Sequence, residues 1–385
     1  MSTKTTEETP ERRQGLKWSM RIGRVAGIDV QVHFTFLLLL AFVAFVHWQN
    51  THSVEAAVAG VAFIVTLFGC VLLHEFGHAL MARRYGIATR DITLLPIGGV
   101  ARLERMPEKP AQEFWVAVAG PAVNVAIAAG LFAWLWATDG FVRAEEMSVT
   151  GGSVLQRLMA VNVFLVLFNL LPAFPMDGGR VLRAALAARM GRRRATAIAA
   201  NVGQAMAILF GVAGFFWNPF LVFIAIFVYL GAQGEADMVQ MQSALEGLRV
   251  RDGMMTRFRT LAPADTLERA VAELLAGSQQ DFPVVEDGVP VGILRRNDLV
   301  KALADNRRDT AVGEVMSRGC ETVDETMPLR AAVEAMQAKQ CGTIPVLRDG
   351  RIAGLLTLEN VSEIVMINTA LESAGREGLQ AAGRR

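Results

Sequence analysis

The chain has 385 residues, of which 38 are Lys or Arg and 37 are Asp or Glu, so its net charge is only +1. This balance gives no indication of nucleic acid or another polyanion as a partner. Hydrophobic residues make up 52% of the chain and charged residues only 19%, against about 25% charged residues in typical soluble domains. The composition therefore argues against an ordinary soluble protein.

The hydrophobic residues are concentrated in the first 235 positions. A transmembrane helix needs about 20 predominantly apolar residues. Stretches with few or no charged residues occupy 30–54, 56–81, 114–138, 158–176 and 195–234, and the last is long enough for two helices joined by a turn at 217–219. The sequence therefore predicts a polytopic α-helical membrane protein, with a polar N-terminal segment at 1–28 and six transmembrane helices within 29–235.

Positively charged residues are unevenly distributed among the predicted loops. They gather in the N-terminal segment and in the loops after the second and fourth helices, whereas the alternate loops contain only Arg143. Loops rich in Lys and Arg face the cytoplasm. We therefore expect a multi-pass protein of the cell membrane whose N- and C-termini are both cytoplasmic.

The second predicted helix contains the sequence H-E-F-G-H at residues 74–78. Residues four apart share one face of a helix, so the imidazoles of His74 and His78 can bind one zinc ion. Glu75 points about 100° away round the helix, a direction that suits a base acting on a metal-activated water. Ionisable side chains inside a transmembrane helix are costly and usually functional, which favours a metal site over a chance match.

A catalytic zinc usually has three protein ligands. Cys70 lies one turn before His74, but a single straight helix cannot easily wrap three ligands around an ion. The better candidate is Asp177, which follows a charge-free stretch and stands among prolines and glycines that break the helix. Irregular backbone at membrane depth is tolerated where it is buried in protein or lines a cavity. The alternative role for Asp177 is to cap the helix that follows it.

The two motifs together resemble those of the site-2 protease family of intramembrane metalloproteases. The matching sequences are H-E-F-G-H at 74–78 and N-L-L-P-A-F-P-M-D-G-G at 169–179, while A-G-P-A-V-N at 119–124 and P-I-G-G-V at 96–100 resemble two further motifs of the family. The resemblance implies that His74, His78 and Asp177 bind zinc and that Glu75 is the general base.

Four further residues are candidates for contact with a substrate or an oxyanion. Asn124 and Asn169 are polar groups in apolar helices, where each can donate to a carbonyl or hold two helices together. We favour the second role for Asn124 and leave both open for Asn169. Gly98 and Gly99 interrupt a β-like segment whose free edge, if it enters the membrane, can pair with an unwound peptide; the alternative is a basic cytoplasmic loop.

Residues 250–366 contain an internal repeat in which strands alternate with helices. This pattern predicts a small α/β module, duplicated so that the two copies bury a shared face. The repeat resembles a pair of cystathionine-β-synthase-type (CBS) domains, a family that binds adenine nucleotides between the copies. We place the parts at 236–249 for a linker, 250–307 and 308–370 for the two copies, and 371–385 for a flexible tail.

Neither copy has the complete nucleotide motif of that family, G-h-h-T/S-x-x-D, where h is hydrophobic. The first keeps Asp298 but has Arg295 in place of the threonine, and the second keeps Thr357 but has Asn360 in place of the aspartate. One composite nucleotide site that uses Asp298 and Thr357 and a purely structural or dimerising role both remain open. A homodimer through the CBS domains is expected in either case.

The resemblances together predict an intramembrane zinc endopeptidase with one Zn²⁺ per chain. Its substrate would be the transmembrane segment of another membrane protein, such as an anti-sigma factor or a membrane-anchored regulator, with regulation by a nucleotide at the CBS tail. The alternatives are a CBS-gated metal-ion transporter and an inactive scaffold. Glu75 beside His74, and a third ligand next to a helix break, favour the hydrolytic centre over both.

Overall fold

A computed structural model of the chain describes residues 18–107, 109–141, 153–318, 321–339 and 341–382. The chain divides into two compact units, residues 1–237 and 238–385, which are described separately. The predicted N-terminal segment up to residue 17, Arg143 and the last three residues of the predicted tail lie outside the described residues.

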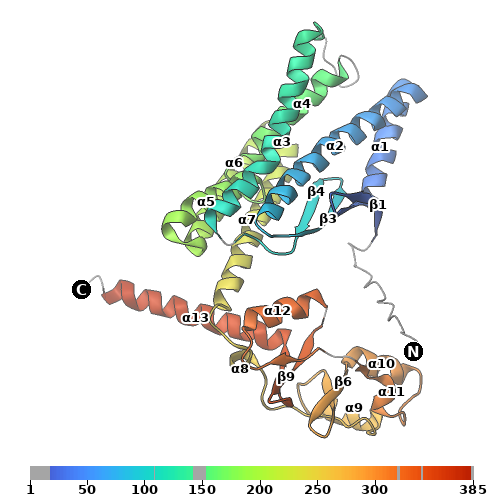
Figure 1. The fold of residues 1–385 in the computed structure, drawn as a ribbon, viewed down its shortest axis with the longest axis vertical. Helices are drawn as coiled ribbons and strands as arrows, with labels where there is room; N and C mark the ends of the chain where they lie inside the picture. The colour runs from blue at the N-terminus through green and yellow to red at the C-terminus, as the bar shows by residue number, and fades with distance from the viewer. Residues whose placement is uncertain (1–17, 108, 142–152, 319–320, 340, 383–385) are drawn as a thin grey trace, which may run out of the picture. The chain divides into compact units, whose positions relative to one another are not determined.

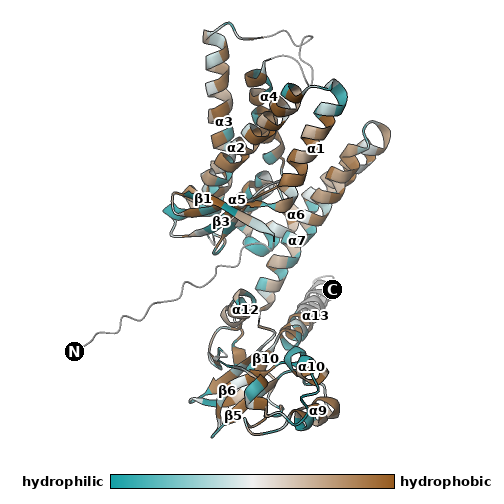
Figure 2. Ribbon diagram, turned by 90° about the vertical axis from the view of Figure 1, so that its right-hand side faces the viewer, coloured by the Kyte–Doolittle hydropathy of each residue, from teal (hydrophilic) through white to brown (hydrophobic). Residues whose placement is uncertain are grey.

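The first unit is mainly helical (Figure 1). Its helices are α1 (Phe34–Thr51), α2 (Val54–Arg84), α3 (Pro110–Ala137), α4 (Val154–Asn169), α5 (Asp177–Met190), α6 (Arg192–Phe216) and α7 (Phe220–Ala244). Among the described residues, α1, α2, α3, α6 and α7 are long and apolar enough to cross a membrane. Figure 2 shows hydrophobic residues along most of these helices. The predicted class, a polytopic helical protein, is therefore confirmed.

Among the described residues, five of the six predicted spans correspond to helices long and apolar enough to cross a membrane. The fourth predicted span, 158–176, is helical only as far as Asn169, and α4 is a 16-residue helix that is apolar but shorter than the other five. The chain then runs through an irregular segment to Asp177, where α5 begins. The break predicted from the prolines and glycines around Asp177 is confirmed.

The outer surface of these helices is strongly apolar. Large side chains such as Phe42 and Phe215 are 63% and 82% exposed, which is costly in water but favourable in lipid. The buried face of α6 consists largely of alanine and glycine. Small residues let helices approach closely, as in membrane proteins where lipid leaves no hydrophobic force between helices.

A four-stranded sheet packs against the end of α2 that carries His74 and His78. Its strands are β1 (Ser19–Val25), β2 (Ile28–His33), β3 (Thr89–Leu95) and β4 (Gly98–Leu103), in the order β1-β2-β3-β4. Strands β2 and β3 are parallel, and the other two pairs are antiparallel. The β-like character predicted for residues 91–103 is confirmed, and β4 forms one edge of the sheet.

Strands β1 and β2 correct the predicted start of the first membrane span. The first predicted span, 30–54, begins as helix only at Phe34. In β2, Ile28, Val30 and Val32 are buried and the residues between them are less so, which is the two-residue period of a strand. Their side chains pack with Phe68, Phe76 and residues of β3. The sheet thereby supports the part of α2 that carries the histidines.

The second unit contains the duplicated module. Its elements are α8 (Val250–Gly253), α9 (Leu267–Ala276), β5 (Phe282–Glu286), β6 (Val289–Leu294), α10 (Arg296–Ala304), α11 (Val312–Val315), β7 (Ser317–Arg318), β8 (Val323–Asp324), α12 (Leu329–Ala338), β9 (Thr343–Arg348), β10 (Arg351–Thr357) and α13 (Leu358–Ala382). They include two three-stranded sheets, β5-β6-β7 and β10-β9-β8. Helix α13 extends through most of the segment predicted to be a flexible tail.

The two copies exchange short segments in a symmetric way. Met255 at the start of the first copy pairs with Leu355 of the second, and β7 at the start of the second pairs with β6 of the first. A Cβ on Gly354 would lie 2.6 Å from the sulfur of Met254, and one on Gly292 would lie 2.6 Å from the sulfur of Met316. Each glycine therefore leaves room for a methionine of the other copy: Gly354 for Met254, and Gly292 for Met316.

Candidate metal centre and active site

The two histidines of α2 point to a common position inside the first unit. His74 and His78 are 6% and 8% exposed, and their Nε2 atoms lie 3.0 Å apart. The four-residue spacing predicted this arrangement, because it places both rings on one helical face.

Asp177 completes a cluster of three from a distant part of the sequence. Its Oδ2 lies 3.2 Å from Nε2 of His74 and 3.1 Å from Nε2 of His78. Within the described residues these three side chains form the one group of three potential metal ligands with this proximity. The structure therefore brings together the ligand set predicted from the sequence.

The glycines after Asp177 let the chain return tightly to this position. A Cβ on Gly178 would overlap the carbonyl oxygens of Leu170 and Leu171, and one on Gly179 would lie 2.7 Å from backbone atoms of Ala173 and Phe174. Both residues must therefore be glycine for α5 to begin here. The first helical residue, Asp177, is held in place by this packing, and no side-chain cap is formed by the residue before it.

Hydrogen bonds on the far side of each imidazole fix how its ring faces the cluster. His78 Nδ1 lies 2.7 Å from the carbonyl oxygen of Val116, and His74 Nδ1 lies 2.5 Å from Oδ1 of Asn124. A carbonyl oxygen only accepts, so each Nδ1 carries a proton, and in the neutral imidazole Nε2 then has a lone pair available for a metal. Metal-binding histidines are commonly held in this way by a second hydrogen bond.

The cluster has the chemistry of a zinc site. The Nε2 atoms of His74 and His78 and one carboxylate oxygen of Asp177 face one another at 3.0 to 3.2 Å, and with both imidazoles neutral all three atoms offer lone pairs to a cation. Ligand atoms about 2.0–2.1 Å from a tetrahedral zinc ion are about 3.3 Å apart, close to these separations. Three protein ligands that leave a fourth position open are typical of catalytic rather than structural zinc.

Helix α3 closes one side of this cluster through a glycine. A Cβ on Gly120 would overlap Nε2 of His78 and would lie 2.7 Å from Nε2 of His74. Gly77 serves the same contact from α2, since a Cβ there would lie 2.6 Å from the carbonyl oxygen of Ala119. The two glycines let the helices approach until the imidazoles touch the backbone of α3.

Glu75 lies between the cluster and the sheet. A Cβ on Gly99, the second residue of β4, would lie 2.5 Å from Cγ of Glu75, so the edge strand passes directly against this side chain. Gly98, with φ of +140°, adopts a conformation that favours glycine at the turn into β4.

The two asparagines predicted as substrate contacts differ in their surroundings. Asn124 is fully buried, and its Oδ1 lies 2.5 Å from Nδ1 of His74, a candidate metal ligand. Asn169 is half-buried at the last residue of α4, eight positions before Asp177. Sequence reasoning did not single out Asn162 of α4, whose Oδ1 accepts a hydrogen bond of 2.8 Å from Asn124 Nδ2.

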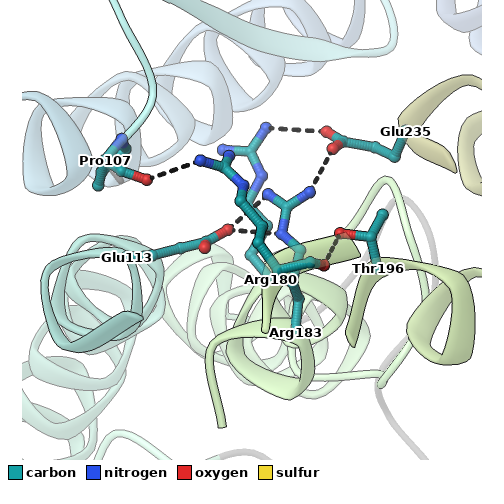
Figure 3. Close-up of polar contacts among 7 residues, drawn as sticks. Pro107, Glu113, Arg180, Arg183, Thr196 and Glu235 are labelled. Carbon is teal, nitrogen blue, oxygen red and sulfur yellow. Dashed lines mark hydrogen bonds and ion pairs between the residues drawn. The ribbon is translucent and has the colours of Figure 1, made fainter. Parts of the chain in front are cut away.

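A buried ionic cluster joins the helix of Asp177 to its neighbours (Figure 3). Arg183 of α5 is 1% exposed and donates to Glu113 of α3 and to Glu235 of α7, each at 2.7 Å. Its guanidinium also lies 4.9 Å from the ring centre of Phe174. Removing one partner from such a buried pair typically costs about 3–5 kcal/mol, so this cluster holds α5 firmly against α3 and α7. The sequence analysis did not predict it.

In the second unit the two candidate nucleotide residues have separate partners. Asp298 of α10 accepts a hydrogen bond of 3.3 Å from Ser317 Oγ. The Thr357 hydroxyl donates to Asn360 Oδ1 at 2.8 Å and accepts from the Asn360 backbone amide at 3.1 Å. Thr357 thus caps the start of α13. The two copies are joined nearby by Thr343, whose hydroxyl donates to Asp281 at 2.8 Å.

Comparison with protein families gives matches over both units. Residues 62–151 and 140–210 match the model of peptidase family M50, and residues 249–305 and 312–367 match that of the CBS domain. The chain is 29% identical to a zinc metalloprotease of Methanocaldococcus jannaschii over 357 residues, which cover 91% of this chain and 97% of that protein.

Two further matches cover part of the chain. The solved structure of a site-2 protease from Methanocaldococcus jannaschii has 36% sequence identity and a TM-score of 0.43, covering 57% of this chain and 95% of that one. A CBS domain-containing protein of Bacillus subtilis is 30% identical over 128 residues, which cover 33% of this chain and 89% of that protein.

Proposed function

Because the chain belongs to peptidase family M50 and carries a pair of CBS domains, we propose that it is an intramembrane zinc endopeptidase that cleaves within or beside the transmembrane segment of another membrane protein. The observation that carries this proposal is the convergence of His74, His78 and Asp177 at 3.0 to 3.2 Å, inside a unit of apolar helices. In this proposal these three residues hold one zinc ion.

Glu75 is the general base of the proposed reaction. When bound, zinc supplies the Lewis acidity that activates water and polarises the scissile carbonyl. The Glu75 carboxylate accepts the proton of the attacking water and then delivers it to the nitrogen of the leaving amine. Its position between the ligand cluster and β4 supports this role, because a peptide lying along the sheet edge would be next to it.

The free edge of β4 is the proposed binding site for the substrate backbone. The peptide bonds of a transmembrane helix are shielded by its internal hydrogen bonds, so cleavage requires local unwinding. An unwound segment can satisfy its backbone groups by adding a strand to an exposed sheet edge. Strand β4 is at the edge of the four-stranded sheet, and Gly99 in it contacts Glu75. A transmembrane regulator such as an anti-sigma factor is the class of substrate we propose.

The rival function, transport of metal ions, is not favoured. A transport path requires successive sites, and within the described ranges the group formed by His74, His78 and Asp177 stands by itself. Both chain ends are proposed to be cytoplasmic, which remains a prediction from the distribution of Lys and Arg. Asn169 remains a proposed contact for the substrate or the oxyanion.

Metal removal tests the proposed function. We expect the purified, zinc-loaded chain in detergent micelles to convert a single-span protein of solubilised membranes into a shorter fragment. A chelator should stop this conversion, and equimolar zinc should restore it, because the ligand cluster alone provides no Lewis acid. Mass spectrometry of the fragments locates the cleaved bond. Equal cleavage without metal, or cleavage confined to soluble proteins, would contradict the proposal.

The second unit is proposed to regulate the peptidase through an adenine nucleotide and to form a homodimer. Asp298 retains the carboxylate that receives ribose hydroxyls in the motif of this family, whereas the Thr357 hydroxyl is engaged with Asn360. Calorimetric titration of the full chain with AMP, ADP and ATP should therefore give a binding signal that Asp298→Ala lowers and Thr357→Val lowers less. Absence of heat with all three nucleotides would leave the unit a structural role.

A further inference from the structure

Two asparagines in the core of the first unit form a continuous hydrogen-bonded chain that ends at a candidate zinc ligand. Asn124 of α3 and Asn162 of α4 are both completely buried. Nδ2 of Asn162 donates to the carbonyl oxygen of Leu158 at 2.9 Å, and Oδ1 of Asn162 accepts from Nδ2 of Asn124 at 2.8 Å. Oδ1 of Asn124 then accepts from Nδ1 of His74 at 2.5 Å.

The direction of every bond in this chain is set at its far end. The carbonyl oxygen of Leu158 can only accept, so the amide nitrogen of Asn162 must face it. The Asn162 oxygen consequently faces Asn124, which turns the Asn124 nitrogen toward Asn162 and its oxygen toward His74. A rotation of either amide by 180° would place two acceptors or two donors against each other in a site where both side chains are fully buried.

His74 needs this constraint more than His78 does. The partner of His78 Nδ1 is the backbone carbonyl of Val116, which cannot exchange acceptor for donor. The partner of His74 is a side-chain amide, whose reversal would present N–H groups to Nδ1 and would move the imidazole proton to Nε2. A protonated Nε2 cannot bind a metal ion.

We propose that Asn162 is a positioning residue: acting through Asn124, it holds His74 in the form whose Nε2 is free to bind zinc. This inference rests on the proposed zinc site and adds helix α4 to it, although Asn162 acts only through Asn124. Hydrogen-bonded partners of ligands typically account for a 10- to 100-fold difference in metal affinity, so the effect is measurable without an assay of activity.

Zinc affinity of the purified full chain in detergent micelles tests the proposal. Zinc retained against a series of chelator concentrations gives the relative affinity, and the visible absorption of the cobalt-loaded chain reports the ligand geometry. Asn162→Leu removes both bonds of the side chain. Asn162→Asp keeps an oxygen that accepts from Asn124. Asn162→Thr keeps a hydroxyl for the Leu158 carbonyl, as is common in transmembrane helices, but is one atom too short to reach Asn124.

The matched control is Gln204→Leu. Gln204 of α6 donates to Gln233 of α7 at 2.8 Å, so this variant also breaks an amide–amide bond between two helices, but one that leads to no candidate ligand. We expect Asn162→Leu and Asn162→Thr to bind zinc about 10- to 100-fold more weakly than wild type and to alter the cobalt spectrum. Asn162→Asp and Gln204→Leu should stay within about threefold of wild type, since neither frees Asn124.

Several outcomes would overturn the proposal. Wild-type affinity in both Asn162→Leu and Asn162→Thr, or equal losses in Asn162→Asp and Asn162→Leu, would show that Asn162 does not set the orientation of Asn124. If Asn162→Leu does not fold, Asn162→Thr against Asn162→Asp decides the question alone. A wild-type chain that binds no zinc would instead refute the proposed zinc site, a failure distinct from equal affinity in all variants.

Discussion

Replacing Glu75 by glutamine is expected to slow peptide-bond cleavage by about 10²- to 10⁴-fold, the usual contribution of a general acid–base group, while the chain keeps its zinc. Glutamine has nearly the same shape as glutamate, so its packing against Gly99 of β4 is preserved. The amide cannot accept the proton of the attacking water. The three ligand atoms of His74, His78 and Asp177 come from other side chains and are unchanged.

The measurement is the rate of conversion of a single-span substrate, with the zinc content determined on the same samples. Glu55→Gln is the matched control, because Glu55 is an exposed glutamate in the first turn of the same helix. It should cleave at the wild-type rate. Cleavage by Glu75→Gln at the wild-type rate would remove Glu75 from the reaction, and loss of zinc from that variant would make Glu75 a ligand instead.

The fold could be predicted from the sequence where one physical signal dominated. Long charge-free stretches indicated the apolar helices, and the internal repeat indicated the duplicated α/β module. Strand β2 was missed because residues 28–33 alternate between buried and less buried positions immediately before a solidly apolar helix. A count of uncharged residues merges the strand with the helix, whereas the period of two in I-D-V-Q-V-H distinguishes them.

The candidate site was predictable to the extent that each residue was unusual in its own segment. His74, Glu75 and His78 share a helical spacing, and Asp177 is a lone carboxylate beside a helix break. The bond from Asn162 to Asn124 could not be read in this way, since it depends on the packing of α3 against α4. A buried asparagine in an apolar helix signals a hydrogen-bonded partner, but the sequence does not say which one.

The ionic cluster around Arg183 illustrates the same limit. Arg183 looked like one of several loop arginines that mark the cytoplasmic side, yet it is 1% exposed between Glu113 and Glu235. Its partners lie 70 and 52 residues away in the chain. Because α5 begins at Asp177, the cluster fixes the helix that supplies the third ligand. The sequence therefore indicated Asp177 as a candidate ligand but did not indicate the ion pairs of Arg183 that hold its helix in place.

Gly120→Ala is expected to abolish most zinc binding and cleavage through the addition of a single methyl group. The new Cβ would overlap Nε2 of His78 and lie 2.7 Å from Nε2 of His74, so the imidazoles or α3 must move. Overpacking of this kind costs about 1–3 kcal/mol of stability. The larger effect falls on the site, where a displacement of about 1 Å can reduce the rate about 10²-fold.

Gly130→Ala provides the control for this experiment within the same helix. A Cβ on Gly130 meets no atom within 4 Å, and alanine has a higher helix propensity than glycine, so this variant should be at least as stable as wild type and fully active. Zinc content, cleavage rate and thermal stability are measured for both variants. If Gly120→Ala matches Gly130→Ala in zinc content and rate, the close approach of α3 to the histidines is not required for the site. If Gly120→Ala loses zinc while keeping most of its stability, Gly120 is needed as space for the side chains of His74 and His78 rather than as a point of helix flexibility.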